Sequence, residues 1–83
     1  MIKVLAEVHI PIIEEQYDIF IPNNKSIRTV IKLLEKAVNE LSDGSYQNRP
    51  TTLLYDQKTG LPYEINKSVK NSGIVNGSKI ILY

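Results

Sequence analysis

The chain has 83 residues, 42% of them hydrophobic, and its ten Lys and Arg against nine Asp and Glu give a formal net charge of +1. This length predicts one small domain with a single core, spanning residues 1–83. The absence of cysteine excludes disulfides and thiolate metal sites, and the balanced, dispersed charge argues against nucleic acid or anionic membrane as a partner. The alternating, charged first ten residues do not resemble a signal peptide, and the apolar runs are too short to cross a bilayer, so we expect a cytoplasmic protein.

Residues 2–21 are predicted to form an antiparallel β-hairpin. In "IKVLAEVHI" and "QYDIFI" apolar and other residues alternate, as in half-buried strands. A fold about Ile12-Ile13 pairs Leu5 with Phe20 on the outer face. The same register predicts that these residues face the helix: Ile2, Val4, Ala6, Val8, Tyr17, Ile19 and Ile21. A one-residue slip would invert a strand, so agreement on both faces favours this register.

The stretch "IPNNKSIRTVIKLLEKAVNELSDG" is predicted to carry the chain's one helix. Ser26 is the expected N-cap and Gly44 the expected C-terminal stop. The buried stripe has helical spacing: Ile27, Val30, Ile31, Leu34, Val38 and Leu41. The other side carries Arg28, Lys32, Glu35, Lys36 and Asn39. We interpret its basic residues as solvated charge, with a docked acidic partner as the alternative.

The second half of the chain is expected to complete a sheet. Residues 42–51 are predicted to be a loop of unassigned role, "TLLYD" a short third strand, and "LPYEIN" an extended piece that Pro62 confines to an edge. Val69 and Ile74 are expected core residues, and "SKIILY" is a closing strand with Ile80 and Leu82 toward the helix. One amphipathic helix over a four- to five-stranded mixed sheet predicts a two-layer α+β fold.

The stretches "VHIPIIEEQYDIFIPNNKSI" and "GIVNGSKIILY" carry a family resemblance. Together they resemble a ubiquitin-like β-grasp domain. More particularly, they resemble the small ubiquitin-like YukD/EsaB proteins of bacterial type VII (WXG-protein) secretion systems. A related domain is fused to a membrane subunit of the mycobacterial systems. The resemblance implies parallel first and last strands at the centre of the sheet. It also implies partners among the membrane ATPase and the cytosolic domains of the membrane subunits.

The end of the sequence bears on modifier chemistry. Ubiquitin-like modifiers and sulfur carriers react through a flexible tail that ends in Gly-Gly, whereas here Tyr83 follows Leu82 and the nearest glycine is Gly77, in a predicted turn. We therefore expect no conjugation or sulfur transfer. The alternative is a modifier or sulfur carrier processed from a longer precursor.

The residues that could carry catalysis are few. His9 is the only histidine and is interpreted as a solvated residue of the first strand, with Glu7 alone too weak a companion for a metal site. Adjacent Glu14 and Glu15 point apart, and no serine has a histidine in a plausible triad. We expect no enzyme activity, no cofactor and no metal.

A protein without chemistry acts by contact, so the apolar residues of the open sheet face are the candidate site. These are Leu5, Phe20, Leu54, Ile81 and Tyr83, with Leu5, Phe20, Leu54 and Ile81 expected in one row across four strands. Such a strip marks an interaction surface, whereas scattered surface apolar residues would mean nothing. Ile12 and Ile13 at the hairpin tip are a second candidate, with packing against the helix end as the alternative.

The predicted function is that of a non-conjugated ubiquitin-like adaptor of a type VII secretion system. It would lie in the cytoplasm, with recruitment to the inner face of the membrane by its partners. Self-association through two complementary strips is a further option. Nucleic-acid binding would require a basic face, which the dispersed lysines do not predict.

Overall fold

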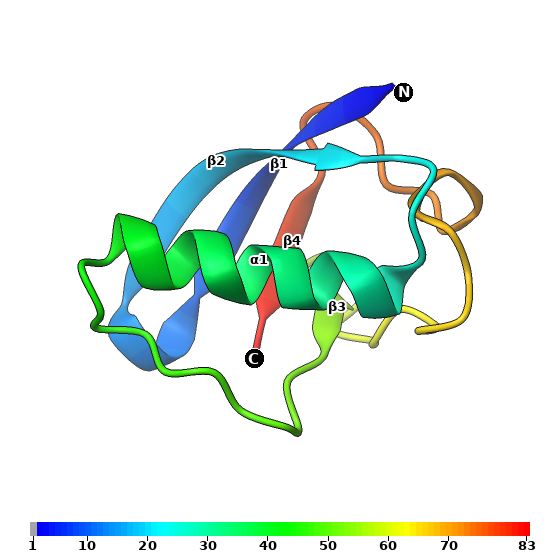
Figure 1. Ribbon diagram of the computed structural model, residues 1–83. Coiled ribbons are helices and arrows are strands. Elements are labelled where there is room, and N and C mark those ends of the chain that lie inside the picture. Colours follow the sequence, from blue (N-terminus) through cyan, green and yellow to red (C-terminus); the bar gives the residue numbers. More distant parts are fainter. Residues whose placement is uncertain (1) are drawn as a thin grey trace.

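A four-stranded mixed sheet in the order β2-β1-β4-β3 carries helix α1 across one face (Figure 1). The computed structural model describes residues 2–83. The elements are β1 (Lys3–Ile10), β2 (Glu15–Pro22), α1 (Ile27–Leu41), β3 (Leu54–Asp56) and β4 (Lys79–Leu82), with short 3₁₀ turns η1 (Pro11–Ile13) and η2 (Val69–Asn71). The central strands β1 and β4 run parallel, and each outer pair is antiparallel. The predicted two-layer α+β architecture is confirmed.

The hairpin has the predicted register. Val4 lies opposite Ile21, Leu5 opposite Phe20 and Val8 opposite Tyr17. The connection is η1, closed by Glu14 in the left-handed conformation at φ 54°. The alternating pattern fixed the pairing because both strands bury one face only.

Helix α1 begins where its cap predicts. The Ser26 hydroxyl oxygen accepts a 3.2 Å hydrogen bond from the Thr29 backbone N–H, which satisfies one donor of the first turn. Two side chains of the helix differ from the prediction: Leu41 is exposed, and Glu35 is buried. Leu41 is the last helical residue, beyond the part that covers the sheet. The predicted helix residues that do enter the core are Ile27, Val30, Ile31, Leu34 and Val38.

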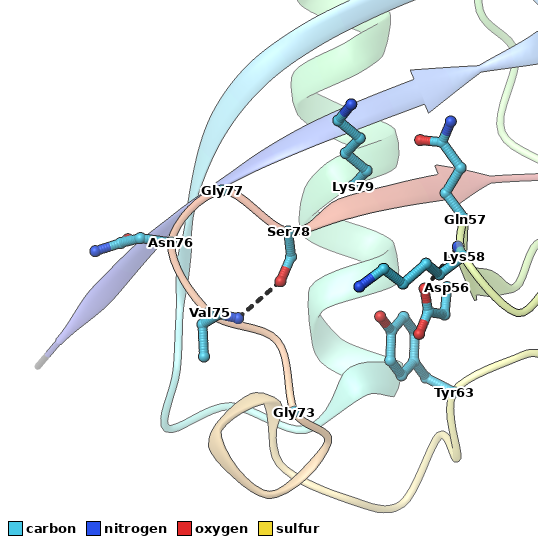
Figure 2. Close-up of a pocket in the computed structure, with 10 residues that line it drawn as sticks. All are labelled: Asp56, Gln57, Lys58, Tyr63, Gly73, Val75, Asn76, Gly77, Ser78 and Lys79. Atoms are coloured by element: carbon cyan, nitrogen blue, oxygen red, sulfur yellow. Dashed lines mark hydrogen bonds between the residues drawn. The ribbon is translucent and has the colours of Figure 1, made fainter.

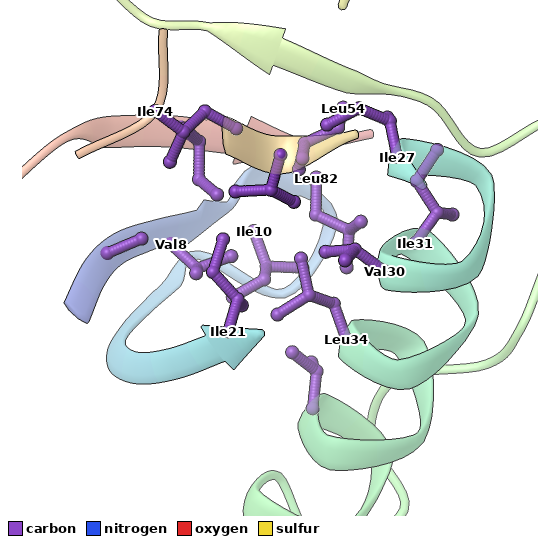
Figure 3. Close-up of a cluster of buried hydrophobic side chains, with 14 of the residues drawn as sticks. Val8, Ile10, Ile21, Ile27, Val30, Ile31, Leu34, Leu54, Ile74 and Leu82 are labelled. Carbon is purple, nitrogen blue, oxygen red and sulfur yellow. The ribbon is translucent and has the colours of Figure 1, made fainter. Parts of the chain in front are cut away.

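The core lies between α1 and the covered sheet face (Figure 3). Val69 and Ile74 are buried there as predicted, and Ile10 joins them. Tyr17 and Ile19 are half-buried against the cluster. Ile2 was expected in the core but is 67% exposed, because it precedes the first paired residue of β1.

The segment between α1 and β3 is held by a buried carboxylate. Tyr46 is only 1% exposed, and Glu35 accepts hydrogen bonds at Oε2 from the Tyr46 hydroxyl, from the Thr52 hydroxyl at 3.0 Å and from the Arg49 backbone N–H at 3.1 Å. A buried carboxylate requires such donors. The predicted loop 42–51 is therefore anchored to the helix through Tyr46 and the Arg49 backbone.

Candidate partner-binding face

The sheet face opposite α1 presents apolar side chains at its two ends. At one end Phe20 is 63% exposed and lies beside the half-buried Leu5. At the other end Ile81 lies opposite Tyr55, and Tyr83 follows Ile81 by strand alternation. We call these two sets the Phe20 end and the Ile81 end. The predicted residues Leu5, Phe20, Ile81 and Tyr83 therefore all lie on the open face.

Leu54 does not belong to this face. It lies opposite Leu82, points toward the helix and is 0% exposed, within the core that Figure 3 shows. The prediction was wrong because "TLLYD" offers two consecutive leucines, and three paired residues are too few to show which of them alternates inward. Tyr55, which the sequence analysis did not select, takes the outward position.

The expected single apolar row is also absent. The parallel pairing sets Ile81 beside His9, whereas Leu5 lies four residues earlier on β1. At about 3.3 Å per residue, the two ends are offset by roughly 13 Å along the strand direction. The open face therefore has two separate apolar contacts.

A charged row separates these two ends. Glu7 lies between Asp18 on β2 and Lys79 on β4. His9 Nε2 is 2.9 Å from Glu7 Oε2, a contact along the strand on the same face. A partner that binds this face would have to match two apolar patches and the charges between them. Charge matching of this kind gives specificity more than affinity.

The hairpin tip divides into one exposed and one packed residue. Ile12 is exposed on η1, whereas Ile13 is half-buried against the core. The alternative for this pair was packing against the helix end; Ile13 does pack, but against the core cluster, and Ile12 does not pack. Ile12 alone stays available for contact.

A hollow lies elsewhere, between the β3 end and the loop before β4 (Figure 2). Its volume is about 640 Å³, and Lys58, Lys79, Tyr63 and Asp56 line it. Burial raises the pKa of Tyr63 above its ordinary value, and nearby Asp56 adds to this. Asp56 Oδ1 accepts a 2.9 Å hydrogen bond from the Lys58 backbone N–H. No sequence pattern predicted this hollow.

Two further features are absent from residues 2–83. Within this range no three His, Cys, Asp or Glu side chains are grouped so as to hold a metal ion. Nor does any helix of this range have the length and apolar character needed to cross a bilayer.

The fold has counterparts of known structure, although no family model and no curated protein matches the sequence. The chain is similar to the ubiquitin-like domain of the Mycobacterium tuberculosis type VII secretion system protein EccD1, with a TM-score of 0.79 and 15% identity over 99% of this chain and 98% of that one. The chain is also similar to a chain of the MycP5-free ESX-5 inner membrane complex, with a TM-score of 0.70 and 15% identity over 98% of this chain and 20% of that one. A chain of the toluene 4-monooxygenase HD complex is similar with a TM-score of 0.78 and 10% identity, over 98% of this chain and 96% of that one.

The protein therefore has the ubiquitin-like β-grasp fold that its sequence predicted. Relatives at this level of identity define the fold, and they include a chain of an oxygenase complex as well as domains of secretion proteins. Because one fold serves many functions, function must be argued from the surface of this chain.

Proposed function

We propose that this protein is a ubiquitin-like accessory protein of a type VII secretion system, acting in the cytoplasm by protein–protein contact. The YukD/EsaB-like segments "VHIPIIEEQYDIFIPNNKSI" and "GIVNGSKIILY" support the system, as does the full-length similarity to the ubiquitin-like domain of EccD1. The partners we propose are the membrane ATPase and the cytosolic domains of membrane subunits. Similarity to a chain of an inner membrane complex supports this choice and a place at the inner face of the membrane.

The observation that carries the mode of action is the exposed Phe20 beside Leu5 on an uncovered sheet face. A large aromatic side chain left in water is a candidate anchor, because aromatic residues contribute much of the energy of protein interfaces. The Ile81 end supplies a second anchor, and Asp18, Glu7 and Lys79 lie between the two. A stable complex would bury about 800 Å² on each partner.

The test is a binding measurement with purified proteins. The chain is immobilised and exposed to the cytosolic part of the secretion ATPase and to the cytosolic domains of the membrane subunits, with biolayer interferometry as the readout. We expect F20D to weaken binding about thirtyfold, the loss of one interface anchor. The double variant L5D/F20D should abolish binding.

Leu33→Asp is the matched control. Leu33 is 45% exposed on α1, on the other side of the molecule from the open face. The L33D variant gains the same negative charge in place of an apolar side chain, and it should bind as the wild type does. Native circular dichroism spectra for all variants would exclude unfolding as the cause. Binding to none of the proteins, or equal loss in L33D and F20D, would overturn the proposal.

A further inference from the structure

A second concave surface, besides the hollow of Figure 2, lies where α1 faces the segment leading into β3. Figure 1 shows that segment returning beneath the helix. The groove has a volume of about 260 Å³, slightly below the 300–1,000 Å³ usual for small-molecule sites. Ile31, Leu53 and Ile65 form its apolar part. It is the size of one or two side chains, so it suits a protein segment.

Three cations border this groove. Arg28 and Lys32 are one helical turn apart on α1, so their side chains lie on the same face, and Arg49 comes from the opposite wall. No ion pair joins any of the three to a carboxylate within residues 2–83. Arg28 has only a long hydrogen bond of 3.4 Å to Asn66 Oδ1. Three cations so placed attract a negatively charged group.

The one acidic residue of the groove is already engaged. Glu35 Oε2 accepts three hydrogen bonds, which compensate much of its charge locally. Even at full charge it leaves the lining with an excess of two positive charges, from Arg28, Lys32 and Arg49 against Glu35.

Arg49 is held in place and incompletely paired. Its backbone N–H is fixed by Glu35, and its guanidinium lies 5.3 Å from the centroid of the Tyr83 ring. Its Nε is buried and has no hydrogen-bond partner among residues 2–83. Buried donors are normally satisfied, so this one would take a water or, after a shift of the side chain, an acceptor from a ligand.

We propose that this groove binds a short acidic segment of a protein partner. A carboxylate would lie among Arg28, Lys32 and Arg49, and a neighbouring apolar side chain would lie on Ile31 and Leu53. Arginine favours this ligand because its planar fork matches a carboxylate. The groove adjoins the Ile81 end, because Arg49 lies over the Tyr83 ring, but none of its lining residues belongs to the Phe20 end. Variants of Phe20 and of Lys32 therefore test the two surfaces separately.

The probe is a fluorescein-labelled peptide, Asp-Glu-Leu-Glu-Asp-Leu-Glu, whose binding is followed by fluorescence anisotropy. Chemical shifts in ¹⁵N-labelled protein then locate it. We expect shifts at the amides of Lys32, Arg49 and Leu53 and none at Phe20. Lys32→Glu should weaken binding about fivefold to tenfold, as expected for reversing one exposed charge.

Lys36→Glu is the control, since it makes the same charge change one turn further along α1 at a residue that does not line the groove. It should weaken binding less than about twofold, because separated surface charges are screened. Equal loss in K32E and K36E would reduce the effect to net charge and overturn the proposal. So would equal binding of the Asn/Gln version of the peptide, or no binding at about 1 mM peptide, a very weak affinity.

Two competing ligands complete the test. A single-stranded oligonucleotide and phosphatidylserine vesicles are offered at matched negative charge. If either binds more tightly than the peptide and loses this advantage in K32E, the groove recognises phosphate and the proposal of an acidic protein segment is overturned. Weaker binding of both supports it.

Discussion

The hydroxyl of Tyr46 donates a 2.7 Å hydrogen bond to Oε2 of Glu35, joining the α1–β3 segment to the helix. Both residues are buried. This contact sets the position of Arg49, whose backbone N–H shares the same oxygen. The Tyr46–Glu35 hydrogen bond thus holds in place the segment that carries Arg49 of the groove, and its contribution to stability can be measured.

We expect Tyr46→Phe to lower the free energy of unfolding by about 1.5–3 kcal/mol, the value of a hydrogen bond to a charged group. The ring stays in place, so the loss reports the hydroxyl. Urea denaturation at neutral pH measures it. A double-mutant cycle with Glu35→Gln should give a coupling energy between the two sites. Strict additivity would contradict the described contact.

The same tyrosine predicts a pH dependence. Burial, with Glu35 adding to it, raises the pKa of Tyr46 above its ordinary value of about 10, although Thr52 and Arg49 act the other way. The folded state then holds the phenol proton more tightly than the unfolded state. This contribution to stability is complete below about pH 10 and is lost as pH rises through the folded pKa.

The stability difference between wild type and Y46F should therefore shrink above about pH 10. Urea denaturation from neutral pH to about pH 11 would show this, because all other titrating groups are common to both proteins. A difference that stays constant over this range would contradict the raised pKa.

Adjacent residues of β3 provide a test of which side chain points inward. Leu54→Ala should destabilise the protein by about 2–5 kcal/mol, because it leaves a cavity in the core. Tyr55→Ala should cost clearly less, since Tyr55 is half-buried on the open face. Thermal and urea denaturation compare the two. A larger loss in Y55A would reverse the strand's orientation.

The turn before β4 depends on a side chain. Asn76 Oδ1 accepts a 2.8 Å hydrogen bond from the Leu5 backbone N–H, between segments 71 residues apart. Asn76→Ala should cost about 1 kcal/mol. Asn66→Ala is the control, since Asn66 meets Arg28 only at 3.4 Å, and it should change stability by less than about 0.5 kcal/mol. Equal effects would show that the Asn76 contact is unimportant.

The hairpin and helix could be predicted because their patterns are long and redundant. The alternation in "IKVLAEVHI" and "QYDIFI" determines the Leu5–Phe20 pair, and Ser26 marks the helix start locally. The inward-facing residue of β3 could not be predicted, because three paired residues are too few to show an alternation. The offset that sets Ile81 beside His9 arises from a parallel pairing of distant segments, which no local pattern encodes.

The burial of Glu35 and Tyr46 could not be predicted for a different reason. Glu35 lies at the edge of the apolar stripe, where periodicity alone assigns a charged residue to solvent. Tyr46 lies in a polar stretch with no period, so its burial depends on Glu35 being there to accept its hydrogen bond. The sequence indicated only two of the groove's cations, Arg28 and Lys32, on one helix face. Its third cation comes from the segment that Tyr46 anchors.

The most direct test of the central claim is a map of the contact surface by chemical shifts in ¹⁵N-labelled protein, titrated with the cytosolic part of the secretion ATPase and with the cytosolic domains of the membrane subunits. We predict that at least one of them shifts Leu5, Phe20, Tyr55 and Ile81. Shifts confined to the outer face of α1 around Leu33, or none with any of these proteins, would contradict the claim.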